Sequence, residues 1–132
     1  MLDITDPHAI HRKLSTIDDS VTIEQAREFV NYDCVIREAD SLPYGGTYHG
    51  PEGFVHLVRT VFGTWRDFGL DILNVWTNNV DTMIQISEIS GSTDRGSFKM
   101  PMVEYYKVRN GKMSEITIIY YDTKLLADLA AT

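Results

Sequence analysis

The spacing of apolar residues near the start of the chain predicts a helix. An apolar side chain recurs every three to four positions at Ile10, Leu14 and Ile17, which is the period of a helix with one buried face. Asp6 and Pro7 come just before this stripe and are typical of a helix cap and first helical position. The polar run at 18–20 ends the pattern.

A second and a third helix follow from the same period. Thr22 and Gln25 have the spacing of a capping box, and the apolar positions after them predict a helix that ends near Asn31, followed by a short strand over 34–37. Gly50 and Pro51 then fit the cap and first position of a third helix. Its apolar stripe consists of Phe54, Leu57, Val58, Val61, Phe62 and Trp65.

After Gly69 the apolar residues alternate with a period of two, which predicts strands. We expect strands near 70–77, 81–90, 97–109 and 112–121, and a short last helix over 123–131. The Asn110-Gly111 pair is typical of a type I′ hairpin turn. Helices and an antiparallel meander are thus segregated along the chain, which indicates one α+β domain over 1–132 whose curved, mostly antiparallel sheet wraps its concave face around the helices.

Both faces of the predicted sheet carry apolar side chains. Phe98, Met100, Met102, Glu104, Tyr106 and Val108 share one face of a strand, and Lys99, Pro101, Val103, Tyr105 and Lys107 share the other. A sheet that is apolar on both sides needs two covers, and the few short helices cover only one. We therefore expect a homodimer formed through the sheet.

Glu104 interrupts an otherwise apolar face. A buried carboxylate is costly unless it is paired or protonated. Two interpretations stay open: Glu104 lies at the rim of the sheet or pairs with a lysine, or it is a pocket acid with a raised pKa.

Asp122 is similarly ambiguous. A two-residue Asn-Gly loop places it opposite Lys99, which favours an ion pair or the cap of the last helix. A bulge in either strand would instead turn Asp122 inward.

Composition narrows the classes of partner. The net charge of the 132 residues is -7 with no cluster of Lys or Arg, which disfavours nucleic acid and anionic membranes. Cys34 is the only cysteine, so we expect a buried thiol, and no spacing typical of a metal site occurs. The chain has neither a signal-peptide core nor an apolar run of ~18 residues, which predicts a cytoplasmic protein.

The segment 40–54, DSLPYGGTYHGPEGF, is unusually rich in glycine and aromatic residues. Its glycines allow tight backbone bends. Either it forms a pocket rim lined by Tyr44, Tyr48 and His49, or it is a rigid lid whose rings point outward.

The order of elements, the segment LPYGGTYHGPEGF, the hairpin VEYYKVRNGKMSEITIIYYD and the ending DTKLLADL together resemble SnoaL-like proteins. These belong to the nuclear transport factor 2-like superfamily, together with ketosteroid isomerase and limonene epoxide hydrolase. The resemblance covers nearly the whole chain. It implies a cone of sheet and helices around one deep apolar pocket, usually in a dimer.

The resemblance also implies site residues. In ketosteroid isomerase a carboxylate base ends the first strand, a place that Glu38 or Asp40 fits, and a protonated acid donates to the oxyanion from the place of Glu104. The tyrosine of that enzyme's first helix is absent here, so His11 or a loop tyrosine would replace it. The SnoaL-like cyclases use a C-terminal aspartate, which Asp122 matches. The Asp–Arg–Asp relay of the epoxide hydrolase lacks a central arginine, so that activity ranks lower.

We therefore expect a protein that binds a hydrophobic small molecule and performs cofactor-free proton transfer, either isomerisation or aldol-type cyclisation, on a carbonyl compound. The alternative is a non-catalytic module that binds an apolar ligand or a partner. The candidate catalytic residues are Glu38, Asp40, Glu104 and Asp122. The candidate ligand-binding residues are His11, Tyr44, Tyr48, His49, Phe54, Trp65, Met100, Met102, Tyr106 and Tyr120, and no metal or cofactor is expected.

Overall fold

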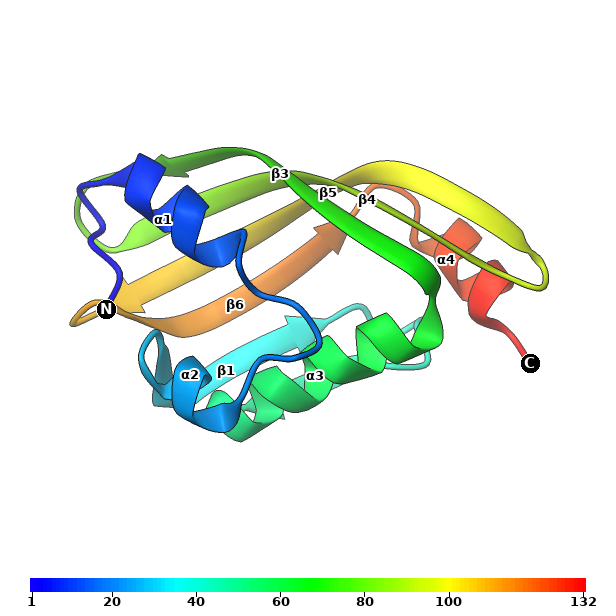
Figure 1. Cartoon of the computed structure of the whole chain (residues 1–132), viewed down its shortest axis with the longest axis horizontal. Coiled ribbons are helices and arrows are strands. Elements are labelled where there is room, and N and C mark those ends of the chain that lie inside the picture. The colour runs from blue at the N-terminus through cyan, green and yellow to red at the C-terminus, as the bar shows by residue number, and fades with distance from the viewer.

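A curved, open sheet of six strands forms the centre of the fold, in the order β2-β1-β6-β5-β4-β3 (Figure 1). The computed structural model describes residues 1–132. The strands are β1 (Val30–Glu38), β2 (Gly46–His49), β3 (Arg66–Thr77), β4 (Thr82–Thr93), β5 (Gly96–Arg109) and β6 (Lys112–Tyr120). The helices are α1 (Pro7–Leu14), α2 (Ile23–Arg27), α3 (Gly50–Thr64) and α4 (Thr123–Ala130).

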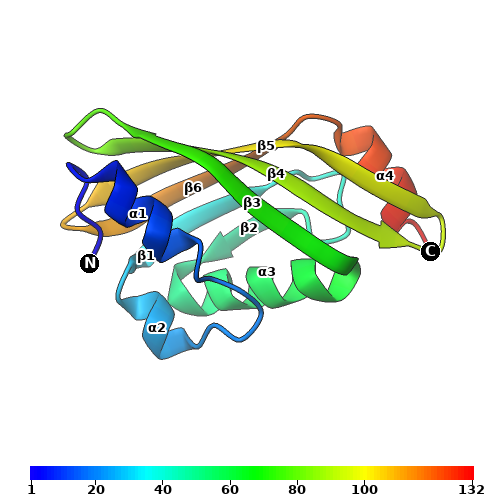
Figure 2. The same ribbon diagram turned by 45° about the horizontal axis from the view of Figure 1, so that its top comes forward.

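The sheet is mixed rather than purely antiparallel. Strands β3 to β6 form the predicted antiparallel meander, whereas β1 runs parallel to β6 and antiparallel to β2. In both views α1 lies across β3, α3 runs beside β1, and α4 lies at the opposite end of the long strands from α1 (Figures 1 and 2). The predicted α+β class with helices against a curved sheet is confirmed.

The first two helices start where their capping residues predict. The side chain of Asp6 accepts a hydrogen bond from the Ala9 amide at 3.1 Å, and the reciprocal bonds of the Thr22–Gln25 capping box are both present. The predicted end of α2 near Asn31 is wrong, because the helix stops at Arg27 and Val30 already begins β1. The reason is tertiary: the Met113 amide of β6 donates to the carbonyl of Phe29 at 2.8 Å and draws this segment into the sheet.

The segment 46–49, predicted as part of a loop, is the short strand β2. It pairs with the end of β1, with Ile36 opposite Tyr48. Gly50, at the junction with α3, has a φ of +68°, and an added Cβ would lie 2.7 Å from the carbonyl oxygen of Tyr32. The sharp turn between β2 and α3 therefore requires glycine at this position.

The β5–β6 hairpin has the predicted turn but a shifted register. Asn110 and Gly111 have φ values of 54° and 76°, as a type I′ turn requires, and Arg109 pairs with Lys112. A bulge beyond Val108 then shifts the pairing by one residue. The predicted pairing of Asp122 with Lys99 is therefore wrong. The Nζ atom of Lys99 instead lies 3.5 Å from Oε1 of Glu88.

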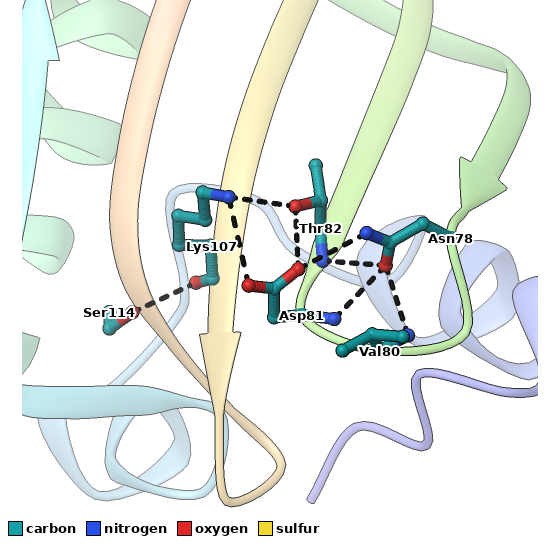
Figure 3. Close-up of polar contacts among 6 residues, drawn as sticks. All are labelled: Asn78, Val80, Asp81, Thr82, Lys107 and Ser114. Carbon is teal, nitrogen blue, oxygen red and sulfur yellow. Dashed lines mark hydrogen bonds and ion pairs between the residues drawn. The ribbon is translucent and has the colours of Figure 1, made fainter.

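A polar cluster closes the β3–β4 turn (Figure 3). The Asn78 side-chain oxygen accepts from the backbone amides of Val80, Asp81 and Thr82, each at 3.0 Å. The Lys107 ammonium, on β5, donates to the Thr82 hydroxyl at 2.9 Å. The turn is therefore held by its own side chains and is tied to the neighbouring strand.

The hydrophobic core fills the space between the concave face of the sheet and the helices. Phe98, Met100, Met102, Tyr106 and Val108 are all buried on this face, as the alternation in β5 predicts. Cys34 is fully buried as well, and burial raises the pKa of its thiol to about 12. None of the four helices has the length and apolar character needed to cross a membrane.

Candidate functional site

A cavity of about 120 Å³ lies between the concave face of the sheet and the helices. Seventeen of its 20 lining residues are hydrophobic. The three others are Glu38, Gln85 and Glu104, and the tyrosines Tyr106 and Tyr120 add two hydroxyl groups. The cavity is thus an apolar chamber with one small polar region.

That polar region is a row across four adjacent strands. Gln85 on β4 is paired with Glu104 on β5, and Glu104 is paired with Ile118 on β6. Glu38 on β1 directly follows Arg37, which is paired with Thr117, so Glu38 lies alongside Ile118. Neighbouring strands are ~4.8 Å apart, so the backbones of the two glutamates are separated by roughly 10 Å across one apolar residue.

Both carboxylate oxygens of Glu38 accept hydrogen bonds. Oε2 accepts from the Tyr120 hydroxyl at 2.9 Å, and Oε1 accepts from the Ala39 amide at 3.1 Å. The residue is only 5% exposed. Burial raises the pKa of Glu38 to about 8, although these hydrogen bonds act in the opposite direction, and the charge of Glu104 adds to the rise.

Glu104 has a different set of neighbours. The Tyr106 hydroxyl contacts its Oε2 and also lies 3.2 Å from the side-chain oxygen of Gln85. The Oε1 atom has no hydrogen-bond partner in the protein. Because no fully buried polar side-chain atom lacks a partner, Oε1 retains accessible surface that a ligand can reach. Burial raises the pKa of Glu104 to about 7.

The two carboxyls titrate as a pair. Each is a like charge for the other, so ionisation of one opposes ionisation of the second. None of the 20 lining residues is Lys, Arg or His, so no cation compensates the pair. Near neutral pH the arrangement favours one ionised and one protonated carboxyl. Because the pKa of Glu38 lies above that of Glu104, the proton is mainly on Glu38 and the charge mainly on Glu104. The form with ionised Glu38 and a proton on the free oxygen of Glu104 is the minor of the two singly protonated forms.

A second layer of aromatic residues supports Glu38 from behind. The indole nitrogen of Trp65 donates to the Tyr44 hydroxyl at 3.0 Å, and the Tyr48 hydroxyl donates to the Tyr44 carbonyl at 2.7 Å. Tyr44 in turn interacts with the Tyr120 hydroxyl. Burial raises the pKa of Tyr44 to about 12, so this layer stays uncharged and holds Tyr120 against Glu38.

Comparison with solved structures identifies the fold. A ketosteroid isomerase-like protein from Catenulispora acidiphila in complex with trimethylamine matches at 14% identity over 83% of this chain and 82% of the other, with a TM-score of 0.66. An NTF2-like protein from Burkholderia thailandensis matches at 21% identity over 92% and 96%, with a TM-score of 0.70. A putative SnoaL-like polyketide cyclase from a Jannaschia species matches at 13% identity over 83% and 79%, with a TM-score of 0.66.

The protein has the nuclear transport factor 2-like fold. The resemblance seen in the sequence is thus confirmed at the level of the fold. No protein-family model matches the sequence, and no curated protein matches it either. At identities this low the likeness carries no information about the reaction, so the site has to be judged on its own residues.

Within this nuclear transport factor 2-like fold, six of the candidate residues line the cavity. They are Glu38, Phe54, Met102, Glu104, Tyr106 and Tyr120. Tyr44, Trp65 and Met100 are buried outside the lining, where the first two form the second layer.

The remaining candidates lie away from the cavity. Asp40 and His49 are exposed, and His11 and Tyr48 are partly buried outside the lining. Asp122 caps α4 by accepting from the Leu125 amide at 3.0 Å. The sequence left open whether Asp122 forms an ion pair, caps the last helix or points inward, and the structure shows that it caps α4.

Gln85 is the polar lining residue that sequence reasoning missed. It is only 3% exposed and donates to the Ser87 hydroxyl at 2.9 Å. The signal was present in the alternation of β4, where Met83, Gln85, Ser87 and Ile89 share one face. Gln85 and Ser87 interrupt an otherwise apolar inner face, as Glu104 does on the next strand, and they therefore indicate a polar region of the pocket in the same way.

Proposed function

We propose that this protein is a small-molecule pocket protein that catalyses cofactor-free proton transfer on a hydrophobic carbonyl compound. The observation that supports the proposal is the Glu38–Glu104 pair, two carboxyls with raised pKa values in one apolar cavity without a cation. Groups poised near neutral pH are suited to giving and taking protons. The volume of about 120 Å³ suits a compound whose reacting part is about the size of one ring.

The proposed reaction uses the minor singly protonated form, with Glu38 ionised and Glu104 protonated. In that form the Glu38 carboxylate removes a proton from the carbon next to the substrate carbonyl. The electron pair of the broken C–H bond becomes a carbon–carbon π bond, and the π pair of the carbonyl moves onto its oxygen, so that an enolate forms; in a substrate with a neighbouring carbon–carbon double bond the enolate is conjugated with it. Protonated Glu104 donates a hydrogen bond from its free oxygen to the developing negative charge on the carbonyl oxygen. Such a hydrogen bond is stronger in an apolar site than in water. Glu38 then returns the proton to another carbon of the same molecule, so the net reaction is an isomerisation.

The test is hydrogen–deuterium exchange at the carbon next to a carbonyl. Cyclohexanone, acetophenone and 2-cyclohexenone are incubated with the protein in D₂O, and exchange is followed by NMR. We expect faster exchange than in buffer, with a bell-shaped pH dependence whose limbs lie near 7 and 8, because the reaction needs one ionised and one protonated carboxyl.

Substitution of the base gives the sharper form of the test. Glu38→Gln should lower the exchange rate by about 10²–10⁴-fold, the usual contribution of a positioned general base. The matched control is Glu88→Gln, a partly exposed carboxylate that pairs with Lys99, which should leave exchange unchanged. Equal rates for wild type and Glu38→Gln would contradict the role of Glu38.

A non-catalytic binding module is the second candidate. The observation that favours it is the apolar character of the cavity, with 17 of 20 lining residues hydrophobic. The complex of one structural neighbour with trimethylamine also supports it. Saturable binding of the same ketones with no exchange above buffer would favour this function over catalysis.

A further inference from the structure

The charges of the cavity lining are unusual because they are all of one sign. Glu38 and Glu104 are its only residues with an ordinarily ionisable carboxyl or amine, and no Lys, Arg or His accompanies them. A buried carboxylate is normally balanced by a cation or stays protonated. The protein supplies hydroxyl and amide donors to the two carboxyls but no positively charged side chain.

The remaining features of the cavity suit a cation with an apolar body. Phe54, Phe62, Phe68, Tyr106 and Tyr120 supply aromatic rings, whose faces attract ammonium groups. Oε1 of Glu104 is an open acceptor. A carboxylate ligand would meet two acids and no positive partner, so the same lining disfavours anions.

We infer that the cavity binds hydrophobic amines in their protonated form, with the ammonium group held between Glu38 and Glu104 and the apolar body against the aromatic walls. The inference rests on the pocket of the proposed function but not on its turnover. It adds a class of ligand, one that would compete with a carbonyl substrate for the same polar row.

Binding of this kind is coupled to proton release. An amine enters already protonated at neutral pH, and its charge stabilises the ionised form of the carboxyl that it meets, so that carboxyl gives its proton to solvent. Of the other titratable groups, Tyr106 and Tyr120 line the cavity with the pair, and Tyr44 and Tyr48 lie outside the lining but near enough to Glu38 for its charge to raise their pKa. Strands β3 and β4 and helices α1 and α3 contribute none to the lining.

The test compares three ligands of one shape and different charge: benzylamine, benzyl alcohol and benzoate. Calorimetry at pH 7.5 should show benzylamine binding at least tenfold more tightly than benzyl alcohol, and benzoate binding more weakly than either. The affinity for benzylamine should rise about tenfold per pH unit between about pH 5 and 7. Titrations in phosphate and in Tris should differ in heat, because a proton is released to the buffer.

Substitution provides the second arm of the test. Glu104→Gln and Glu38→Gln should each lower benzylamine affinity by tenfold or more and change benzyl alcohol affinity by less than about threefold, whereas Glu88→Gln should change neither. Thermal unfolding of each variant checks the fold, and the wild-type ligand series decides the question even where a variant fails to fold.

Equal binding of benzoate and benzylamine, or a benzylamine affinity that does not change with pH, would overturn the inference. Its failure is distinguishable from failure of the proposed function. Amine binding without ketone exchange retains the inference and overturns the proposed catalysis, whereas exchange without a preference for amines does the reverse.

Discussion

Burial is the main cause of the raised pKa of both cavity carboxyls. Glu38 receives two hydrogen bonds that favour its charged form, yet removal from water outweighs them. The same effect acts on Glu104. A protein that needs only stability gains nothing from such groups, since apolar residues of similar volume would cost less. The two glutamates are therefore the residues whose presence most needs a functional reason.

The pair has a consequence for stability that needs no substrate. Both pKa values rise from 4.5 in the unfolded chain to about 8 and about 7 in the folded protein, so the folded state binds more protons over this interval. The stabilising contribution is fully present below pH 4.5 and is lost as the pH rises through the two folded values. We expect the free energy of unfolding to fall between pH 5 and 8 by on the order of a few kcal/mol.

Chemical denaturation of wild type, Glu38→Gln and Glu104→Gln at several pH values measures this effect. Each substitution should flatten the dependence and stabilise the protein at pH 8 relative to wild type. Glu88→Gln serves as the control and should follow the wild-type curve. A wild-type protein that gains stability from pH 5 to 8 would contradict the raised values.

At the scale of elements, side-chain caps determine where turns and helices begin. The β3–β4 turn depends on one asparagine, because Asn78 satisfies three backbone amides at the same time. The start of α4 depends on Asp122. Both residues substitute for backbone hydrogen bonds that the chain cannot make at those points.

Asn78→Ala should lower the free energy of unfolding by about 1–3 kcal/mol, because it leaves several turn amides without an acceptor. Asn74→Ala is the matched control, since Asn74 is an exposed residue of the same hairpin and should change stability by less than about 0.5 kcal/mol. Urea denaturation measures both variants. A loss that is equal in the two would show that the Asn78 contacts do not stabilise the turn.

Asp122 offers a test that separates capping from catalysis. Asp122→Ala should destabilise the protein by about 0.5–2 kcal/mol through loss of the α4 cap, and Asp122→Asn should cost much less because asparagine also caps helices. Neither variant should alter ketone exchange under conditions where it is folded. A selective loss of exchange in Asp122→Asn would restore the catalytic role that the resemblance to SnoaL-like cyclases implied.

At the scale of the whole molecule, the convex face of the sheet carries exposed apolar residues. Trp76, Ile86 and Ile119 are 53%, 41% and 54% exposed. Val103 is paired with both Ile86 and Ile119, so one apolar row crosses three strands. The nearby charges are paired within the chain, Lys99 with Glu88 and Arg37 with Glu115, so they cancel and do not repel a second copy.

We propose that two copies of the chain associate through this face. Sedimentation at micromolar concentration should give a dimer for wild type, and Ile86→Lys with Ile119→Lys should shift it to a monomer that keeps its fold by circular dichroism. Tyr32→Lys, an exposed position on β1 outside the row, is the control and should stay dimeric. A wild-type monomer at this concentration would contradict the proposal.

Much of the fold was predictable because it depends on local signals. The period of the apolar residues in α3, the cap at Asp6 and the Asn110-Gly111 turn each give the structure of the segment that carries them. Alternation in β5 also placed Glu104 on the inner face. The parallel pairing of β1 with β6 and the bulge beyond Val108 had no such signal, because they depend on contacts between distant segments.

The sequence by itself determined which side chains share a face within an unbroken strand such as β5 and where the Asn110-Gly111 turn lies, since both follow from the geometry of a few consecutive residues. Only the tertiary structure decided which carboxyls line the same cavity. Strand pairing brings Glu38 beside Glu104 across β6, a one-residue shift in register leaves Asp122 as a helix cap, and burial raises the two pKa values. Each of these depends on residues far apart in the chain, so the candidate site is a property of the folded molecule.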